Sequence, residues 1–165
     1  MYKRLLQMPE TPNQSFSLWG PRRTGKTTLL KERYPDALRI DLLKTDELVR
    51  YATEPSRLRD EVTMLSKDDL VIIDEIQKAP LLLDEIHYMI QEWQRVFGLC
   101  GSSARKVRRG HANLLGGRAI RYELLGLVAE ELGADFSIER WVNTGPLPDH
   151  YGAENPGPAL RVIVL

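Results

Sequence analysis

The fold is decided by one stretch of sequence, Gly20-Pro21-Arg22-Arg23-Thr24-Gly25-Lys26-Thr27. It matches the pattern GxxxxGK[ST] of a phosphate-binding loop, the Walker A motif. The glycines let the backbone curl close to phosphates, and loop N–H groups at the start of a helix attract those anions. We therefore expect the whole loop, through Thr28, to bind a nucleotide. Within it, Lys26 would contact the β- and γ-phosphates, and Thr27 would ligate Mg²⁺.

On both sides of this loop, short apolar runs alternate with amphipathic stretches. The predicted strands are residues 16–19, 37–43, 70–73, 96–100 and 119–127. The predicted helices are 26–34, which Pro35 ends, 45–65 with a break near Pro55, 80–95, and a polar stretch marked by Glu130, Glu131 and Glu139. This alternation predicts an α/β fold, a three-layer α/β/α sandwich with a mainly parallel sheet and its ligands at the carboxyl edge of the strands.

An acidic pair, Asp74 and Glu75, follows the apolar run 70–73. At the tip of a buried strand, Asp74 is placed to hold Mg²⁺ through water, the Walker B role. Glu75 would polarise a water for attack on the γ-phosphate, which a P-loop kinase does not need. The alternative is a solvated acidic turn, which the Walker A motif upstream disfavours.

The two arginines of the loop have two interpretations. Arg22 and Arg23 either touch phosphate or lie in solvent on the outer rim of the loop, and the second is the simpler interpretation.

The bulk composition fits one soluble globular domain. The chain has 165 residues, 42% of them apolar and 28% charged, and a formal net charge of zero. A single cysteine, Cys100, excludes an intrachain disulfide, and the N-terminus lacks the apolar core of a signal peptide. Because no apolar run approaches the ~20 residues that span a bilayer, we expect a cytoplasmic protein without a membrane partner.

A basic stretch precedes the last predicted strand. Residues 104–122 contain no acid but several basic residues, namely Arg105, Lys106, Arg108, Arg109, Arg118 and Arg121. The stretch is either a nucleic-acid patch or a basic face near the nucleotide site or a partner subunit. The histidines, His87, His111 and His150, show no metal-binding spacing, and Cys100 is expected to be a buried small residue.

Beyond the Walker motifs, the chain resembles a known family over nearly its whole length. The resemblance rests on residues 19–28 (WGPRRTGKTT), 71–78 (VIIDEIQK), 100–106 (CGSSARK) and 114–119 (LLGGRA). It is to the bacterial and archaeal AAA+-like ATPases of the AAA_14 group, whose full-length members carry a C-terminal domain of the DUF4143 type. No residue pattern in the sequence distinguishes adenine from guanine. ATP as the nucleotide is therefore what the resemblance implies.

The resemblance also suggests two further site residues. Ser102 or Ser103 would be the polar sensor of the γ-phosphate, although Ser103 could instead cap the next helix. Arg118 would be an arginine finger offered to a neighbouring subunit of a homo-oligomer, or a surface arginine paired with an acid.

The end of the sequence departs from the family pattern. We expect the ATPase domain to cover 1–150 and 151–165 to begin a truncated C-terminal region, because the apolar tail 159–165 stops in mid-element. The predicted function is Mg²⁺-dependent ATP hydrolysis coupled to an unknown partner or to the missing domain. The alternatives are a nucleotide-gated module acting on DNA or protein, and an inactive fragment.

Overall fold

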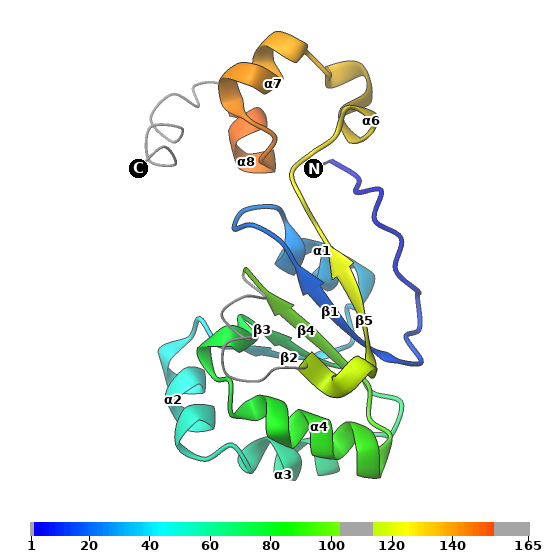
Figure 1. Cartoon of the computed structure of the whole chain (residues 1–165), viewed down its shortest axis with the longest axis vertical. Coiled ribbons are helices and arrows are strands. Elements are labelled where there is room, and N and C mark those ends of the chain that lie inside the picture. Colours follow the sequence, from blue (N-terminus) through cyan, green and yellow to red (C-terminus); the bar gives the residue numbers. More distant parts are fainter. Residues whose placement is uncertain (1, 103–113, 154–165) are drawn as a thin grey trace.

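The fold is built on a parallel β-sheet. The computed structural model describes residues 2–102 and 114–153. The strands in this part of the chain are β1 (Ser15–Trp19), β2 (Leu38–Asp41), β3 (Val71–Asp74), β4 (Phe97–Gly101) and β5 (Ala119–Glu123). They lie in the order β2-β3-β4-β1-β5, and every neighbouring pair is parallel (Figure 1). The predicted parallel α/β fold is therefore confirmed.

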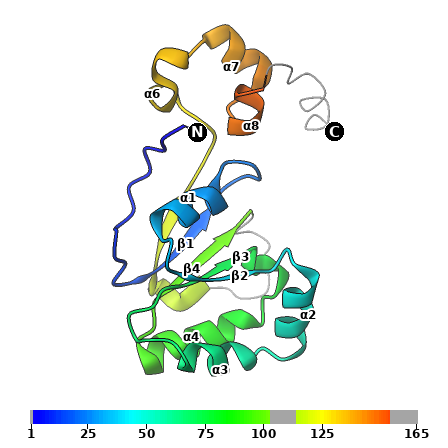
Figure 2. The ribbon, with the colours of Figure 1, turned by 180° about the vertical axis from the view of Figure 1, so that it is seen from behind.

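Helices cover both faces of this sheet. Helix α1 (Lys26–Arg33) lies against one face, and α2 (Thr45–Thr53), α3 (Arg57–Thr63) and α4 (Leu82–Trp93) lie against the other (Figures 1 and 2). The break expected near Pro55 separates α2 from α3. A short 3-10 turn, η1 (Ile76–Lys78), lies between β3 and α4, and another, η2 (Leu114–Gly117), precedes β5. The result is the three-layer α/β/α sandwich expected from the sequence.

The sheet separates two hydrophobic cores because successive side chains of a strand point to opposite sides of a sheet. In β3, Val71 and Ile73 pack against α2, α3 and α4, whereas Ile72 packs on the α1 side. Cys100 also belongs to the α1 side and is fully buried. Burial raises the pKa of its thiol, with the charge of Asp74 adding to the effect, so the thiol stays protonated.

The last strand is shorter than predicted. The sequence suggested a strand over 119–127, but β5 ends at Glu123. Its register explains the difference, because Glu123 pairs with Trp19, the last residue of β1. One further hydrogen bond, from Leu124 N to Trp19 O at 2.7 Å, closes the pairing. Beyond that point β1 has turned into the loop at Gly20 and offers no further ladder partner.

A small helical segment lies above the carboxyl edge of the sheet (Figure 1). It consists of α6 (Ala129–Leu132), the 3-10 turn η3 (Gly133–Asp135), α7 (Ile138–Thr144) and α8 (Pro148–Tyr151). We call residues 127–153 the helical segment. The polar helical stretch predicted from its glutamates is confirmed. Its own small core joins Leu127, Leu132 and Tyr151 to Tyr2, which lies in the N-terminal segment before β1 (residues 2–14).

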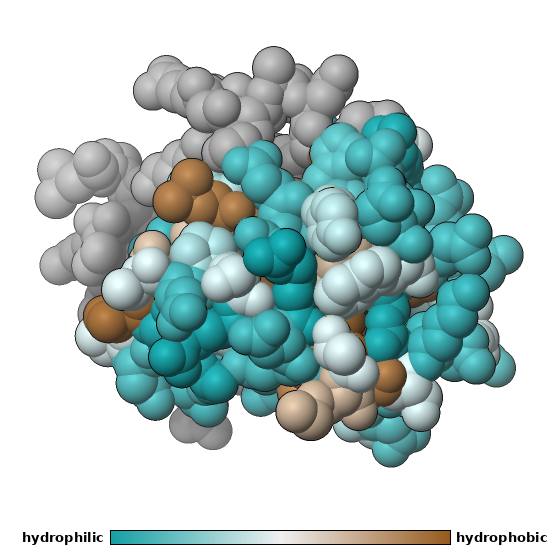
Figure 3. All heavy atoms as spheres, turned by 90° about the horizontal axis from the view of Figure 1, so that it is seen from below, coloured by the Kyte–Doolittle hydropathy of each residue, from teal (hydrophilic) through white to brown (hydrophobic). Residues whose placement is uncertain are grey.

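The outer face of the α2–α4 layer is mainly hydrophilic, with isolated apolar side chains (Figure 3). None of the helices in the described ranges is long and apolar enough to cross a bilayer. Some sequence expectations lie outside the described residues: Ser103, the apolar tail, and the basic residues Arg105, Lys106, Arg108 and Arg109.

Candidate functional site

The phosphate-binding loop runs from the end of β1 to the start of α1, and its backbone depends on glycine at two points. A Cβ on Gly20 would lie 1.9 Å from the carbonyl oxygen of Leu124, so no other residue fits there without moving the backbone. Gly25 caps α1 in the left-handed region with φ 87°. Arg23 also adopts left-handed φ, at 65°. The loop therefore curls through residues 20–25 as its glycines predict.

Lys26 lies beneath this curl. Its side chain is buried, and Nζ donates hydrogen bonds to Gly20 O at 2.8 Å and Pro21 O at 2.6 Å. Burial lowers the pKa of Lys26, while the nearby carboxylates of Glu75 and Asp74 act in the opposite direction. The ammonium is thus held at the centre of the loop, where its charge is available to a phosphate.

The first turn of α1 meets the end of β3. Thr27 Oγ1 donates a hydrogen bond of 2.6 Å to Asp74 Oδ2, and the backbone N–H of Glu75 donates to Asp74 Oδ1 at 2.9 Å. A hydroxyl and a carboxylate side by side are hard oxygen ligands that suit Mg²⁺, which binds few protein groups and keeps several waters. The residues present therefore fit Mg²⁺. In the described part of the chain, no cluster of three or more His, Cys, Asp or Glu side chains offers another cation site.

Glu75 is held by two polar neighbours. It has left-handed φ at 57° and lines the cleft beside the loop. Gln77 Nε2 donates to Glu75 Oε2 and approaches Ser102 Oγ at 3.2 Å. Ser102 Oγ lies 3.4 Å from the same oxygen of Glu75. Sequence reasoning assigned no role to Gln77, although this residue lies in the stretch 71–78 that carries the family resemblance.

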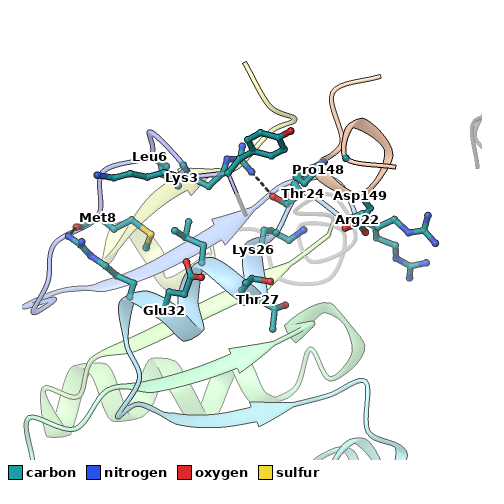
Figure 4. Close-up of a pocket in the computed structure, with 18 of the residues that line it drawn as sticks. Lys3, Leu6, Met8, Arg22, Thr24, Lys26, Thr27, Glu32, Pro148 and Asp149 are labelled. Carbon is teal, nitrogen blue, oxygen red and sulfur yellow. Dashed lines mark hydrogen bonds between the residues drawn. The ribbon is translucent and has the colours of Figure 1, made fainter. Parts of the chain in front are cut away.

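A cleft of about 1200 Å³ opens over the loop. Figure 4 shows Lys26 and Thr27 between the N-terminal side chains Leu6 and Met8 on one side and Pro148 of α8 on the other. Residues 22–28 of the predicted loop line it. The lining residues that sequence reasoning missed are Tyr2, Lys3, Arg4, Leu6, Met8, Leu29, Glu32, Arg33, Leu43, Asp135, Pro148, Asp149 and Gly152. The cleft is thus formed by the loop, the N-terminal segment and the helical segment together.

Arg4, in the N-terminal segment, is hydrogen-bonded both to the loop and to the helical segment. Its guanidinium donates to Thr24 O at 2.5 Å, to Leu125 O at 2.8 Å and to Glu131 Oε1 at 2.9 Å. Glu131 Oε1 also accepts the N–H of Leu5 at 2.8 Å. The side chains of Arg4 and Glu131 are only 9% and 5% exposed.

A second contact joins the loop directly to α8. Arg23 Nη1 lies 3.3 Å from Nε2 of the buried His150, and because arginine only donates, this ring nitrogen accepts. Arg22 is exposed on the rim of the cleft. The two arginines therefore have different environments.

Arg118 is not brought to this site. It is exposed and directly precedes Ala119, which pairs with Ser15 at the amino end of β1. The loop follows the opposite end of β1, ~13 Å away at the usual rise of a strand. Within one chain, Arg118 therefore lies at the opposite edge of the sheet from Lys26, and its proposed role toward a neighbouring subunit stays a prediction.

Comparisons with solved structures give partial likenesses. An ORC2 protein from Aeropyrum pernix, solved in ADPNP–ADP complexes, is 17% identical with a TM-score of 0.47, covering 73% of this chain and 44% of that one. The RuvB Holliday junction branch migration motor from Thermotoga maritima is 23% identical with a TM-score of 0.44, covering 72% and 40% respectively. The chain thus spans less than half the length of these proteins. No curated protein sequence gives a match.

The family comparison is more extensive. The AAA_14 family, described as an AAA domain, matches residues 12–133, well over half of the chain. The match includes the loop, the acidic pair and all the strands of the sheet. This chain therefore belongs to the AAA_14 family of AAA domains, a P-loop ATPase family.

Proposed function

We propose that this chain binds ATP with Mg²⁺ and hydrolyses it. The observation that carries the proposal is the hydrogen bond between Thr27 and Asp74, which brings the loop and the acidic pair into one cluster with Lys26 and Glu75. ATP, as opposed to another nucleoside triphosphate, is proposed from the family resemblance.

Each residue has a role that its place supports. The loop N–H groups and Lys26 bind the phosphates, and Thr27 and Asp74 would hold Mg²⁺, which neutralises charge on the phosphate oxygens. Glu75 orients a water and accepts its proton. The water oxygen forms a bond to the γ-phosphorus, the bond from that phosphorus to the bridging oxygen breaks, and ADP leaves with the electron pair.

ATPase assays and thermal melting of the full chain test this proposal. Lys26→Ala should abolish binding, and with it the stabilisation of roughly 2.7 kcal/mol expected at about 100 times the dissociation constant. Glu75→Gln should retain that stabilisation but lose about 10²- to 10⁴-fold in turnover. Lys31→Ala on the exposed side of α1 and Glu92→Gln on α4 are matched controls. Normal turnover by Glu75→Gln would show that another group activates the water.

A second candidate function is a nucleotide-gated switch. The contacts of Arg4 with Thr24 and Glu131, and of Arg23 with His150, join the loop directly to the helical segment. A phosphate that repositions the loop would strain these contacts and so change how the helical segment is held. The segment would then act on DNA, on a protein or on a further domain of the DUF4143 type.

The two candidates can be separated with the Glu75→Gln variant. Amide hydrogen exchange in residues 127–153 is compared with ADP and with ATP bound, so that hydrolysis does not blur the result. A difference between the two nucleotides supports the switch. Equal exchange, with turnover in the wild type, supports hydrolysis without signalling through this segment.

A further inference from the structure

Gln77 makes an unusual set of contacts. It lies in η1, directly after the acidic pair, and its side chain turns back toward Glu75. Its Nε2 donates to Glu75 Oε2 and also lies 3.2 Å from Ser102 Oγ. Two residues from different strand ends, Gln77 after β3 and Ser102 after β4, thus converge on one oxygen of the acid.

The chemistry of the groups sets the orientation of this amide. An ionised carboxylate only accepts hydrogen bonds, so the nitrogen of Gln77 and not its oxygen must face Glu75. The amide oxygen, Oε1, is then buried and has no hydrogen-bond partner among the described residues. Leaving a buried acceptor unpaired is unfavourable, and native structures tolerate it mainly where another requirement prevails. Here that requirement is the contact with Glu75.

The end of β4 is shaped to accommodate the amide. A Cβ on Gly101 would lie 2.3 Å from Gln77 Oε1 and 2.5 Å from Cζ3 of Trp19. Glycine at this position therefore leaves room for the amide and for the neighbouring indole of Trp19. Residues at the ends of β1 and β4 thus border the place where the amide lies.

The two oxygens of Glu75 are left in different situations. Oε2 receives Gln77 and Ser102, whereas no hydrogen bond from the described residues reaches Oε1. Glu75 also lines the cleft. We propose that Gln77 is the positioning residue for Glu75: it anchors Oε2, with Ser102 as a second support, and leaves Oε1 to take the proton of the attacking water. This inference rests on the proposed ATP hydrolysis.

A double-mutant cycle on the full chain tests the proposal. Gln77→Ala should lower kcat ~10- to 100-fold, as expected when a reacting group is misplaced by about 1 Å. KM and the affinity for a non-hydrolysable ATP analogue should not change, because the side-chain hydrogen bonds of Gln77 among the described residues go to Glu75 and Ser102 and not to the loop. Gln91→Ala, an exposed glutamine of α4, is the matched control and should behave as wild type.

The decisive measurement is made in the Glu75→Gln background. If Gln77 acts through Glu75, then Glu75→Gln/Gln77→Ala should turn over no more slowly than Glu75→Gln alone. Additive losses, or an unchanged kcat in Gln77→Ala, would overturn the positioning role. A wild-type chain that binds but does not hydrolyse ATP would instead refute the proposed function itself, so the two failures are distinguishable.

A shape-preserving variant guards against a merely structural effect. Gln77→Met keeps the approximate volume of the side chain but removes the N–H donor. It should also lose kcat while its melting temperature stays within a few degrees of Gln91→Ala. Full activity in Gln77→Met would show that the side chain fills space and does not position Glu75.

Discussion

The hydroxyl of Thr27 donates to Asp74 Oδ2 at 2.6 Å across 47 residues of sequence. This contact joins the first turn of α1, the helix that follows β1, to the tip of β3, and β4 lies between β1 and β3 in the sheet. The two proposed Mg²⁺ ligands, Thr27 and Asp74, are therefore hydrogen-bonded directly to each other.

The first prediction concerns Asp74→Asn. Losing the carboxylate should weaken Mg-ATP binding roughly 10- to 100-fold, as for other changes around metal ligands, while ATP binding without Mg²⁺ should stay the same. Calorimetric titration with Mg²⁺ and with EDTA measures both. Asp68→Asn, in the exposed loop before β3, is the control. Equal weakening in both buffers would mean that Asp74 supports the loop and not the cation.

A second prediction compares the two glycines of the loop. Gly20→Ala should destabilise the chain by about 3 kcal/mol or more, because its Cβ would meet the backbone oxygen of Leu124. Gly25→Ala meets no atom within 4 Å and has only the cost of left-handed φ, about 1–2 kcal/mol. Thermal melting should therefore rank Gly20→Ala well below Gly25→Ala. The reverse order would contradict the described packing of Leu124.

A third prediction concerns the buried pair of Arg4 and Glu131. Arg4→Ala leaves the carboxylate of Glu131, only 5% exposed, without its cationic partner, which should cost about 3–5 kcal/mol. Arg4→Lys keeps the charge but not the branched contacts with Thr24 and Leu125, so it should recover only part of the loss. Melting curves of the three chains at pH 7 measure this order.

The same pair predicts a pH dependence. Burial alone would raise the pKa of Glu131, but hydrogen bonds from Arg4, Leu5 and Val128 outweigh it and hold the pKa below its ordinary 4.5. A lowered folded-state pKa stabilises the fold above pH 4.5, and this contribution is lost as pH falls through the folded-state value. The difference in melting temperature between wild type and Arg4→Ala should therefore shrink in acid. A difference that is constant from pH 7 to pH 3 would contradict the pairing.

The fourth prediction concerns Arg118, which lies at the far edge of the sheet from the loop. If it serves a neighbouring subunit, Arg118→Ala should lower kcat about 10³-fold or more. Mixing Arg118→Ala with Lys26→Ala should then restore activity, because some interfaces combine an intact loop with an intact arginine. Arg121→Ala, exposed on β5, is the control. Absence of recovery, with Arg118→Ala active alone, would make Arg118 an ordinary surface residue.

Local features of this chain could be predicted from its sequence, whereas features that depend on distant residues could not. The order of strands and helices could be predicted because the periodicity is local, and the glycines of residues 20–25 carry their own geometric requirement. The end of β5 was missed because it depends on where β1 stops, which is 104 residues away in the register Trp19↔Glu123.

The surroundings of the site were harder still. Arg4 and Glu131 are 127 residues apart, and neither belongs to a motif. Gln77 lies in the stretch 71–78 that carries the family resemblance, but only its tertiary contacts show that its amide turns back to Glu75. Such contacts follow from tertiary packing, so no pattern within a short window of sequence contains them.

The strand order has a consequence for how the chain is made. Strand β1 pairs with β4 through Phe16↔Gly98 and with β5 through Ser15↔Ala119, so its two partners are translated 82 and 104 residues after it. Closing such long loops slows folding, and chains emerge from the ribosome N-terminus first. The strand that leads into the phosphate-binding loop is therefore translated long before β4 and β5, and it acquires both of its neighbours in the sheet only after β5 has been made.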